Sequence, residues 1–203
     1  GVYAPWTASK DEGWLRWTLD YCEIPYRRVR NEAVRAGRLR DHLDVLILPS
    51  VASSTLRHGR SEGEVFSQYT GGLEPEGSVA IEEFVRDGGT LIACDWSVAF
   101  AVDLFGLELE SAVGRGDDRF RCPGSILRTV PTSDSPWTAG FPASQPIYFA
   151  KSRVYAPKAG AEDDDVGEEL LVYPKSGILL SGWAKNAAKI AGAAAWRRVR
   201  IGD

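Results

Sequence analysis

Residues 88–97 read Gly88-Gly89-Thr90-Leu91-Ile92-Ala93-Cys94-Asp95-Trp96-Ser97, and this stretch decides the fold. The two glycines end a helix, and the apolar run that follows them is typical of a strand. The segment 98–106 comes after the Asp-Trp-Ser corner and is apolar nearly all round, which predicts a buried helix. A strand that feeds a helix through a tight corner is the centre of an open α/β sheet, where ligands and nucleophiles lie. The residue at this corner is Asp95.

The alternation of strand and helix patterns extends over residues 1–106. Val2–Pro5 has the pattern of a first strand, and Ser9 with Glu12 forms a capping box that begins a helix. The apolar run 44–50 is typical of a central parallel strand covered on both faces. Around these elements we expect a strand at 26–30, a helix capped by Asn31 and ending near His42, a long loop at 51–73 and a helix that begins near Pro75. The alternation predicts an α/β fold with a parallel core and flavodoxin-like winding.

The first expected helix carries aromatic residues at helical spacing. Trp14, Trp17 and Tyr21 share one stripe, and Leu15 and Leu19 lie on the stripe beside it. An apolar stripe of a surface helix normally faces the core, so we expect these aromatic rings to pack on the sheet.

The pattern changes after Gly106. Short alternating segments, separated by proline, glycine and aspartate, predict a β-rich extension of the core over residues 107–203. The expected strands lie at 107–110, 120–130, 147–150, 153–155, 170–173, 178–181 and 193–201. We expect residues 1–203 to form a single domain, and Gly202-Asp203 to open a hairpin turn whose return strand is cut off.

Composition and charge exclude several classes of partner. The net charge of −4 leaves no basic surface for nucleic acid. No apolar run approaches the roughly 20 residues that span a bilayer. Three cysteines and two histidines are too few for a disulfide framework or a multi-histidine metal site. We therefore expect no cofactor and no metal, and cysteine usage does not indicate a compartment.

The order of the elements resembles the class I glutamine amidotransferase-like fold. The resemblance implies a three-layer sandwich and, in catalytic members, a nucleophilic cysteine at the corner in an I-C-x-G pattern, with a histidine and an acidic residue further along. Here Cys94 falls at the last strand position and Asp95 at the position of the nucleophile, and no histidine follows His58. The resemblance therefore implies a scaffold without the catalytic triad. A hydrolase or amidotransferase-like enzyme that uses Asp95 or Cys94 is the alternative.

Four separated motifs resemble the amidotransferase-like accessory domain of bacterial zinc carboxypeptidases of the M14 family. They are Tyr3-Ala4-Pro5-Trp6-Thr7-Ala8-Ser9-Lys10-Asp11-Glu12-Gly13-Trp14, Gln68-Tyr69-Thr70-Gly71-Gly72-Leu73, Cys122-Pro123-Gly124-Ser125 and Leu179-Leu180-Ser181-Gly182-Trp183. The H-x-x-E zinc motif is not matched, because Val45 and Ser61 stand three residues after the histidines. The resemblance implies a non-catalytic packing, oligomerisation or ligand-binding domain. It also implies a neighbouring peptidase domain in the parent chain and a secreted or periplasmic location.

Polar and aromatic residues are expected to gather at the carboxyl edge of the sheet. The candidate ligand-binding residues are Trp6, Thr7, Asp11, Glu12, Tyr69, Thr70, Asp95 and Ser97. Helix capping alone explains the carboxylates, since an acidic side chain at a helix N-terminus accepts from backbone N–H groups. Together, aromatic faces, hydroxyls and carboxylates suit a small molecule such as a sugar, a peptide fragment or a cell-wall fragment. A hard cation such as Ca²⁺ is the weaker alternative.

Overall fold

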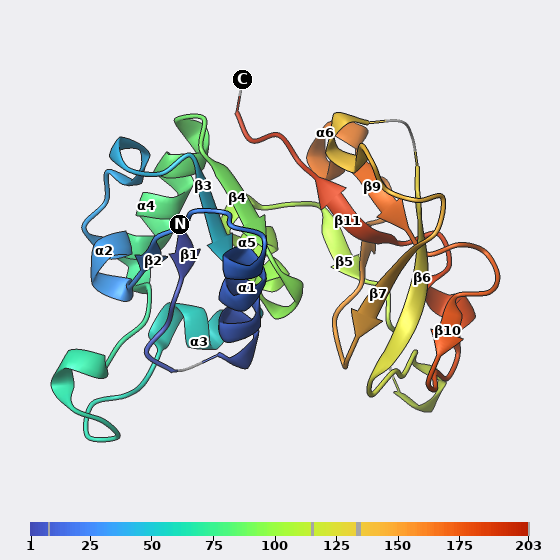
Figure 1. The fold of residues 1–203 in the computed structure, drawn as a ribbon, viewed down its shortest axis with the longest axis horizontal. Coiled ribbons are helices and arrows are strands. Elements are labelled where there is room, and N and C mark those ends of the chain that lie inside the picture. The colour runs from blue at the N-terminus through green and yellow to red at the C-terminus, as the bar shows by residue number, and fades with distance from the viewer. Residues whose placement is uncertain (8, 115, 133–134, 203) are drawn as a thin grey trace. The chain divides into compact units, whose positions relative to one another are not determined.

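The computed structural model describes residues 1–7, 9–114, 116–132 and 135–202. It divides into two compact units (Figure 1). The first unit comprises residues 1–106 together with the end of the chain from Ile201, and the second comprises residues 107–200. Each unit has its own hydrophobic core. None of the helices in the described residues is long and apolar enough to cross a bilayer. Asp203, half of the expected terminal turn, lies outside the described residues.

The first unit is built on a sheet of four parallel strands in the order β2-β1-β3-β4. This is the order of flavodoxin-like doubly wound sheets, in which ligands bind where the winding reverses, between β1 and β3. The mixed α/β class with a parallel core is thereby confirmed. The strands are β1 Val2–Tyr3, β2 Arg28–Val29, β3 Val45–Leu48 and β4 Thr90–Ala93.

Helices connect these strands, and α3 is the one among them that the sequence pattern did not predict. The α-helices are α1 Lys10–Tyr21, α2 Asn31–Arg35, α3 Ser53–His58, α4 Glu74–Arg86 and α5 Val98–Phe105. Short 3₁₀ turns lie at η1 Leu39–Asp41, η2 Ser67–Tyr69 and η3 Asp95–Ser97. The loop expected at 51–73 therefore contains a helix and a 3₁₀ turn.

The single helix expected from Asn31 to His42 is wrong. Gly37 and Arg38 both adopt positive φ angles, 73° and 52°, which end α2 and separate it from η1. Asn31 is also not the cap, because Arg30 takes that position. The Asn31 side chain is instead buried and accepts a hydrogen bond from the Tyr3 hydroxyl at 2.7 Å.

The central strands are covered unequally on their two faces, contrary to the expectation for residues 44–50. Leu46 and Leu48 of β3 are fully buried, and they belong to the same hydrophobic core as Phe84 of α4. Val45 and Ile92 are 36% and 42% exposed. Successive side chains of a strand point to opposite faces, so one face of the sheet is sealed and the other is partly open.

The expectation that the aromatic residues of α1 pack on the sheet is wrong as well. Trp14, Trp17 and Tyr21 are 65%, 57% and 77% exposed. In α1, all of whose residues are described, only Glu12 is buried. The helix thus turns a carboxylate inward and its rings outward.

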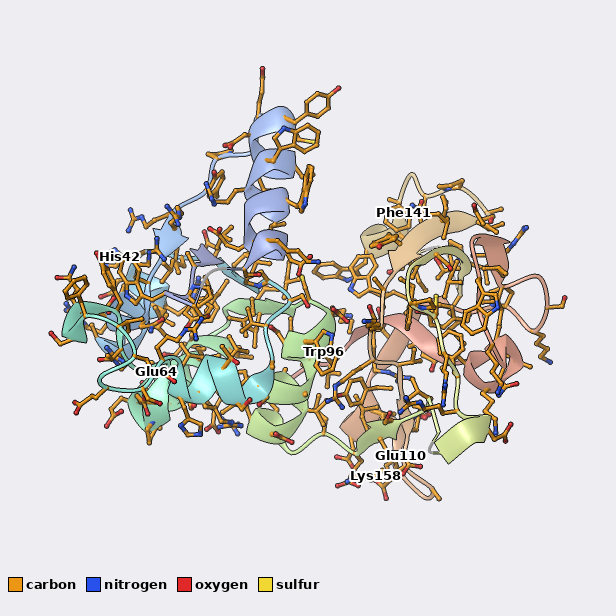
Figure 2. The ribbon with its side chains drawn as sticks, turned by 90° about the horizontal axis from the view of Figure 1, so that it is seen from below. His42, Glu64, Trp96, Glu110, Phe141 and Lys158 are labelled. Atoms are coloured by element: carbon orange, nitrogen blue, oxygen red, sulfur yellow. The ribbon has the colours of Figure 1, made fainter. Side chains whose placement is uncertain are left out.

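The second unit is an antiparallel seven-stranded sheet in the order β10-β6-β9-β11-β8-β5, with β7 paired to β6. Its strands are β5 Leu109–Ser111, β6 Ser125–Pro131, β7 Gln145–Phe149, β8 Tyr155–Pro157, β9 Glu168–Val172, β10 Leu179–Ser181 and β11 Ala194–Arg198. Short helical segments are η4 Gly116–Asp118, η5 Pro136–Thr138, α6 Asp163–Val166 and η6 Ala187–Ile190. Every strand expected after Gly106 has a counterpart here. Lys158 forms an ion pair with Glu108 at 3.1 Å beside the β5–β8 ladder, near Glu110 in Figure 2.

Candidate functional site

A cavity of about 580 Å³ opens where the winding of the parallel sheet reverses. Its walls come from the segment after β1 and from the segments after β3, so we call it the switch-point cavity. It is lined by hydroxyls of Thr7, Ser9, Ser50, Thr55 and Ser61, by carboxylates of Asp11 and Glu64, by the cations Lys10 and Arg60, and by Val51 and Gly59. The cavity is therefore predominantly polar and carries charges of both signs.

Asp95 lies directly behind this cavity, at the corner after β4. Its φ angle is 49°, in the left-handed region that few residues other than glycine, asparagine and aspartate adopt. The Ser50 hydroxyl donates to Asp95 Oδ2 at 2.6 Å and so ties the corner to the cavity wall. The other oxygen, Oδ1, is buried and accepts no hydrogen bond from the described residues. Buried polar atoms almost always have a partner, so this oxygen marks a position where a donor is missing.

Ser97 holds the backbone of the corner together. Its side chain is fully buried, and its hydroxyl donates to the Pro49 carbonyl. The same oxygen accepts from the Val51 amide at 3.2 Å. Ser97 therefore fixes the exit of β3, which includes Ser50, against η3.

Cys94 is poorly suited to nucleophilic attack. Burial, the carboxylate of Asp95 and then that of Asp11 raise the pKa of its thiol to about 11, so the thiolate is scarce at neutral pH. His42 precedes β3 and so belongs to the opposite edge of the sheet. His58 is 74% exposed at its side chain and its Nδ1 lies 4.0 Å from Glu74.

Glu12 does not line the switch-point cavity. Its backbone N–H donates to the Ser9 hydroxyl at 3.3 Å, which is one half of the expected capping box. Its buried carboxylate instead lies 2.6 Å from Arg16 Nε and 3.3 Å from Arg28 Nε. Glu12 therefore fastens α1 to β2.

Trp6, Tyr69 and Thr70 line a second cavity of about 640 Å³, together with Glu32 and Arg35. The Trp6 and Tyr69 rings lie 4.9 Å apart at an angle of 57°. The Arg30 guanidinium lies 3.9 Å from the Trp6 ring centroid, and Trp6 Nε1 donates to Glu32 at 3.1 Å. The indole is thus already occupied by neighbouring side chains, which leaves little of it for stacking with a ligand.

The structure separates the eight candidate residues into four groups. Trp6, Tyr69 and Thr70 lie in the second cavity, Thr7 and Asp11 in the switch-point cavity, and Asp95 behind it. Ser97 and Glu12 are buried in internal contacts. The sequence analysis missed Ser50, although its position at the end of the expected strand 44–50 could have indicated it. Across the described parts of the chain, no three His, Cys, Asp or Glu residues gather as a metal site would need.

Comparison with known proteins concerns the fold. No protein-family model matches the chain, and no curated protein sequence matches it. A solved structure from Bacteroides uniformis, provisionally described as a ThuA-like protein, aligns with a TM-score of 0.50 at 12% identity, covering 95% of this chain and 81% of its own. The chain has a glutamine amidotransferase-like fold. A Thermoplasma acidophilum protein, provisionally described as one of the subunits of GMP synthase, aligns with a TM-score of 0.49 at 12% identity, covering 80% and 68% of the two chains.

The amidotransferase-like fold was expected from the order of the elements. Neither solved structure is described as part of a carboxypeptidase, so the link to the M14 family stays a prediction.

Proposed function

We propose that this chain is a non-catalytic amidotransferase-like domain that binds a small polyhydroxylated ligand, such as a carbohydrate or cell-wall fragment, in the switch-point cavity. The observation that carries the proposal is Asp95, which accepts from the cavity-lining Ser50 through Oδ2 and whose buried Oδ1 has no donor among the residues that the structure describes. Because Ser50 donates its proton to Asp95, the lone pairs of its oxygen are left to accept from a ligand hydroxyl.

The lining of the cavity supports a ligand rich in hydroxyls. Serine and threonine hydroxyls both donate and accept, and the carboxylates of Asp11 and Glu64 accept from sugar hydroxyls. Lys10 and Arg60 provide donors for a ligand carboxylate or amide oxygen, as a muropeptide would carry. The proposal thus replaces the aromatic stacking expected at Trp6 with hydrogen bonding at Ser50 and Asp11.

We further propose that the domain accompanies a zinc carboxypeptidase domain in a secreted or periplasmic parent protein and that its helices and sheet form a three-layer sandwich. The support is the resemblance carried by the four motifs, two of which include residues of the two cavities. The motif Cys122-Pro123-Gly124-Ser125 belongs to the second unit, where Ser125 donates to the Trp183 carbonyl at 2.8 Å. That contact joins the third motif to the fourth.

An enzyme that uses Asp95 or Cys94 is the second candidate. The positive φ angle of Asp95 favours it, because strained backbone gathers at active sites. The raised pKa of the Cys94 thiol opposes it, and so does the position of both histidines. Release of ammonia from glutamine by this chain, abolished in Asp95→Asn, would support the enzyme and contradict the binding proposal.

The experiment is a calorimetric titration of the chain with a muropeptide and with simple sugars. We expect at least one of these probes to bind. Asp95→Asn should bind it roughly ten- to hundredfold more weakly, because the carboxylate that orients the Ser50 hydroxyl in the cavity wall is lost. Asparagine keeps the size of the side chain and tolerates the same φ angle, so the backbone is preserved. Asp103→Asn, in an exposed carboxylate of α5, is the matched control and should bind as the wild type does. Equal affinity of Asp95→Asn and the control, or no binding of any probe, contradicts the proposal.

A further inference from the structure

Helix α1 presents its aromatic stripe to solvent, while its more buried side carries Glu12, Leu15, Arg16 and Leu19. Lys10, Trp14, Trp17 and Tyr21 follow one another at helical spacing along the outer stripe. The inner side is held by Glu12, buried between two arginines. Figure 2 shows α1 projecting from its unit with ring-bearing side chains along it. An amphipathic helix with this polarity has an apolar face that lacks a partner within its own unit.

The rings on this stripe are already ordered against one another. Trp14 and Trp17 meet edge to face with centroids 5.9 Å apart, and Trp17 stacks on Tyr21 at 5.5 Å and 16°. A continuous ladder of aromatic rings on a helix loses little side-chain entropy when a partner covers it. Aromatic residues of this kind dominate the binding energy of protein interfaces.

The charges at the two ends of the stripe indicate what the partner is. Exposed Lys10 begins the stripe, and exposed Asp20 flanks its end beside Tyr21. A stripe that is positive at one end and negative at the other is complementary to itself when reversed. We propose that α1 docks antiparallel on α1 of a second copy of this chain, with Trp14 against Trp17 and Lys10 against Tyr21 and Asp20.

This arrangement satisfies the geometry of antiparallel helix packing. In the heptad numbering of coiled coils, Trp14 and Tyr21 occupy positions of type "a", and Lys10 and Trp17 occupy positions of type "d". In an antiparallel pair of helices, each "a" side chain packs against a "d" side chain of the other helix. The Lys10 ammonium then lies over the Tyr21 ring of the second copy, a cation–π contact, with the Asp20 carboxylate beside it. Gly13 lies opposite Asp20 in this register, and a Cβ at Gly13 would meet no atom within 4 Å, so the backbones can approach.

The exposed area predicts a weak dimer. Trp14, Trp17 and Tyr21 are each more than half exposed, and an aromatic side chain has a surface of roughly 150–250 Å². Covering the exposed part of all three would therefore bury roughly 300–500 Å² of each copy. That lies below the area of a standard specific interface, so we expect a dissociation constant between roughly 10 μM and 1 mM.

Sedimentation equilibrium over roughly 5–500 μM protein measures this dimer directly. Trp17→Glu is expected to raise the dissociation constant more than about tenfold, because it places a charge in the central layer. Trp183→Glu, at an aromatic residue of similar exposure in the second unit, is the matched control and should dimerise as the wild type does. A wild type that stays monomeric throughout this range overturns the proposal, as does an equal effect of both substitutions.

A charge exchange tests the antiparallel direction. Lys10→Glu and Asp20→Lys each place a charge favourable to the helix dipole. Asp20→Lys also removes the hydrogen bond that Asp20 accepts from the Tyr26 hydroxyl at 3.3 Å, so far-UV circular dichroism of each variant verifies that α1 stays folded. Each is expected to raise the dissociation constant roughly three- to tenfold, and the double variant to restore it. If the single variants dimerise normally, or if the double variant fails to recover, the proposed docking is wrong.

Discussion

Three neighbouring residues at the end of β4 have separate tasks. Ser97 uses its hydroxyl to hold the exit of β3, and Asp95 uses one oxygen to orient Ser50. Cys94 contributes a buried thiol whose pKa is raised. The corner is therefore a structural joint that is tied to the cavity wall through Ser50.

Ser97→Ala is expected to lower the free energy of unfolding by about 1–3 kcal/mol, because the Val51 amide and the Pro49 carbonyl both lose their partner in a buried site. Urea denaturation measures the effect. Ser54→Ala, on the exposed side of α3, is the control and should change stability by less than about 0.5 kcal/mol. Equal stability of the two variants would show that Ser97 does not hold the corner.

The raised pKa of Cys94 predicts a loss of stability in alkali. The folded chain retains the thiol proton up to about pH 11, whereas the unfolded chain releases it near its ordinary pKa of 9.0. The contribution of the Cys94 thiol to the free energy of unfolding is therefore fully present below pH 9, and about 2–3 kcal/mol of it is lost between pH 9 and 11. Urea denaturation across this range should show a shallower decline in Cys94→Ala than in the wild type. Cys22→Ala, at an exposed thiol, should keep the wild-type decline; if both variants behave alike, the shift is absent.

At the scale of elements, α1 and the segment after β3 depart most from the sequence pattern. Helix α1 is anchored by its buried carboxylate rather than by its rings. The segment after β3 folds back on itself, because the Gly71 amide donates to the Arg60 carbonyl at 2.8 Å and Asn31 donates to the Gly71 carbonyl at 2.9 Å. Both elements border the cavities, so their packing sets the shape of the proposed site.

Gly59→Ala is expected to destabilise the chain more than Gly63→Ala. Both glycines have positive φ angles, 58° and 84°, so alanine strains the backbone by roughly 1 kcal/mol at either position. At Gly59 a Cβ would also overlap the Gly71 carbonyl oxygen, whereas at Gly63 it would meet nothing within 4 Å. We expect an additional loss of about 1–3 kcal/mol for Gly59→Ala, measured by thermal denaturation. Similar melting temperatures for the two variants would contradict the close approach of the two segments.

At the scale of the whole molecule, the chain contains two hydrophobic cores. The first gathers residues such as Tyr3, Leu46 and Phe100, all from the unit with the parallel sheet. The second gathers residues such as Phe120 and Phe149, all from the unit with the antiparallel sheet. No residue of the described chain belongs to both clusters, so each unit buries its own apolar surface.

Phe149→Ala is expected to cost about 3–5 kcal/mol, the usual loss for a buried phenylalanine, and to act on the second unit. Native-state hydrogen exchange should show lower protection of amides within 107–200 and unchanged protection within 1–106. Phe100→Ala, equally buried in the first core, should give the reverse pattern. Loss of protection in both units from either substitution would show that the two cores unfold together.

The sequence by itself determined the strands of both units and the helices α1, α4 and α5, but not α3 or the break after α2. Hydrophobic period and turn residues are local, so they placed β4, its corner and the strands after Gly106 to within a few residues. They also indicated Asp95 as the residue at the corner. The same local reasoning failed where two positive φ angles broke the helix after Asn31, because nothing in the pattern marks a left-handed arginine at position 38.

Only the tertiary structure decided which faces are covered and which side chains meet. The rings of α1 face outward because Glu12 on the opposite side of the helix forms ion pairs with Arg16 and with Arg28 of β2. A buried carboxylate requires such partners. Five of the candidate residues line two separate cavities, where the hydrogen bond from Asn31 to Gly71 and the close approach of Gly59 to Gly71 bring distant segments together. Ser50 joins Asp95 because Ser97 fixes their two strands in register. Such contacts depend on residues far apart in the chain, and no periodicity along the sequence encodes them.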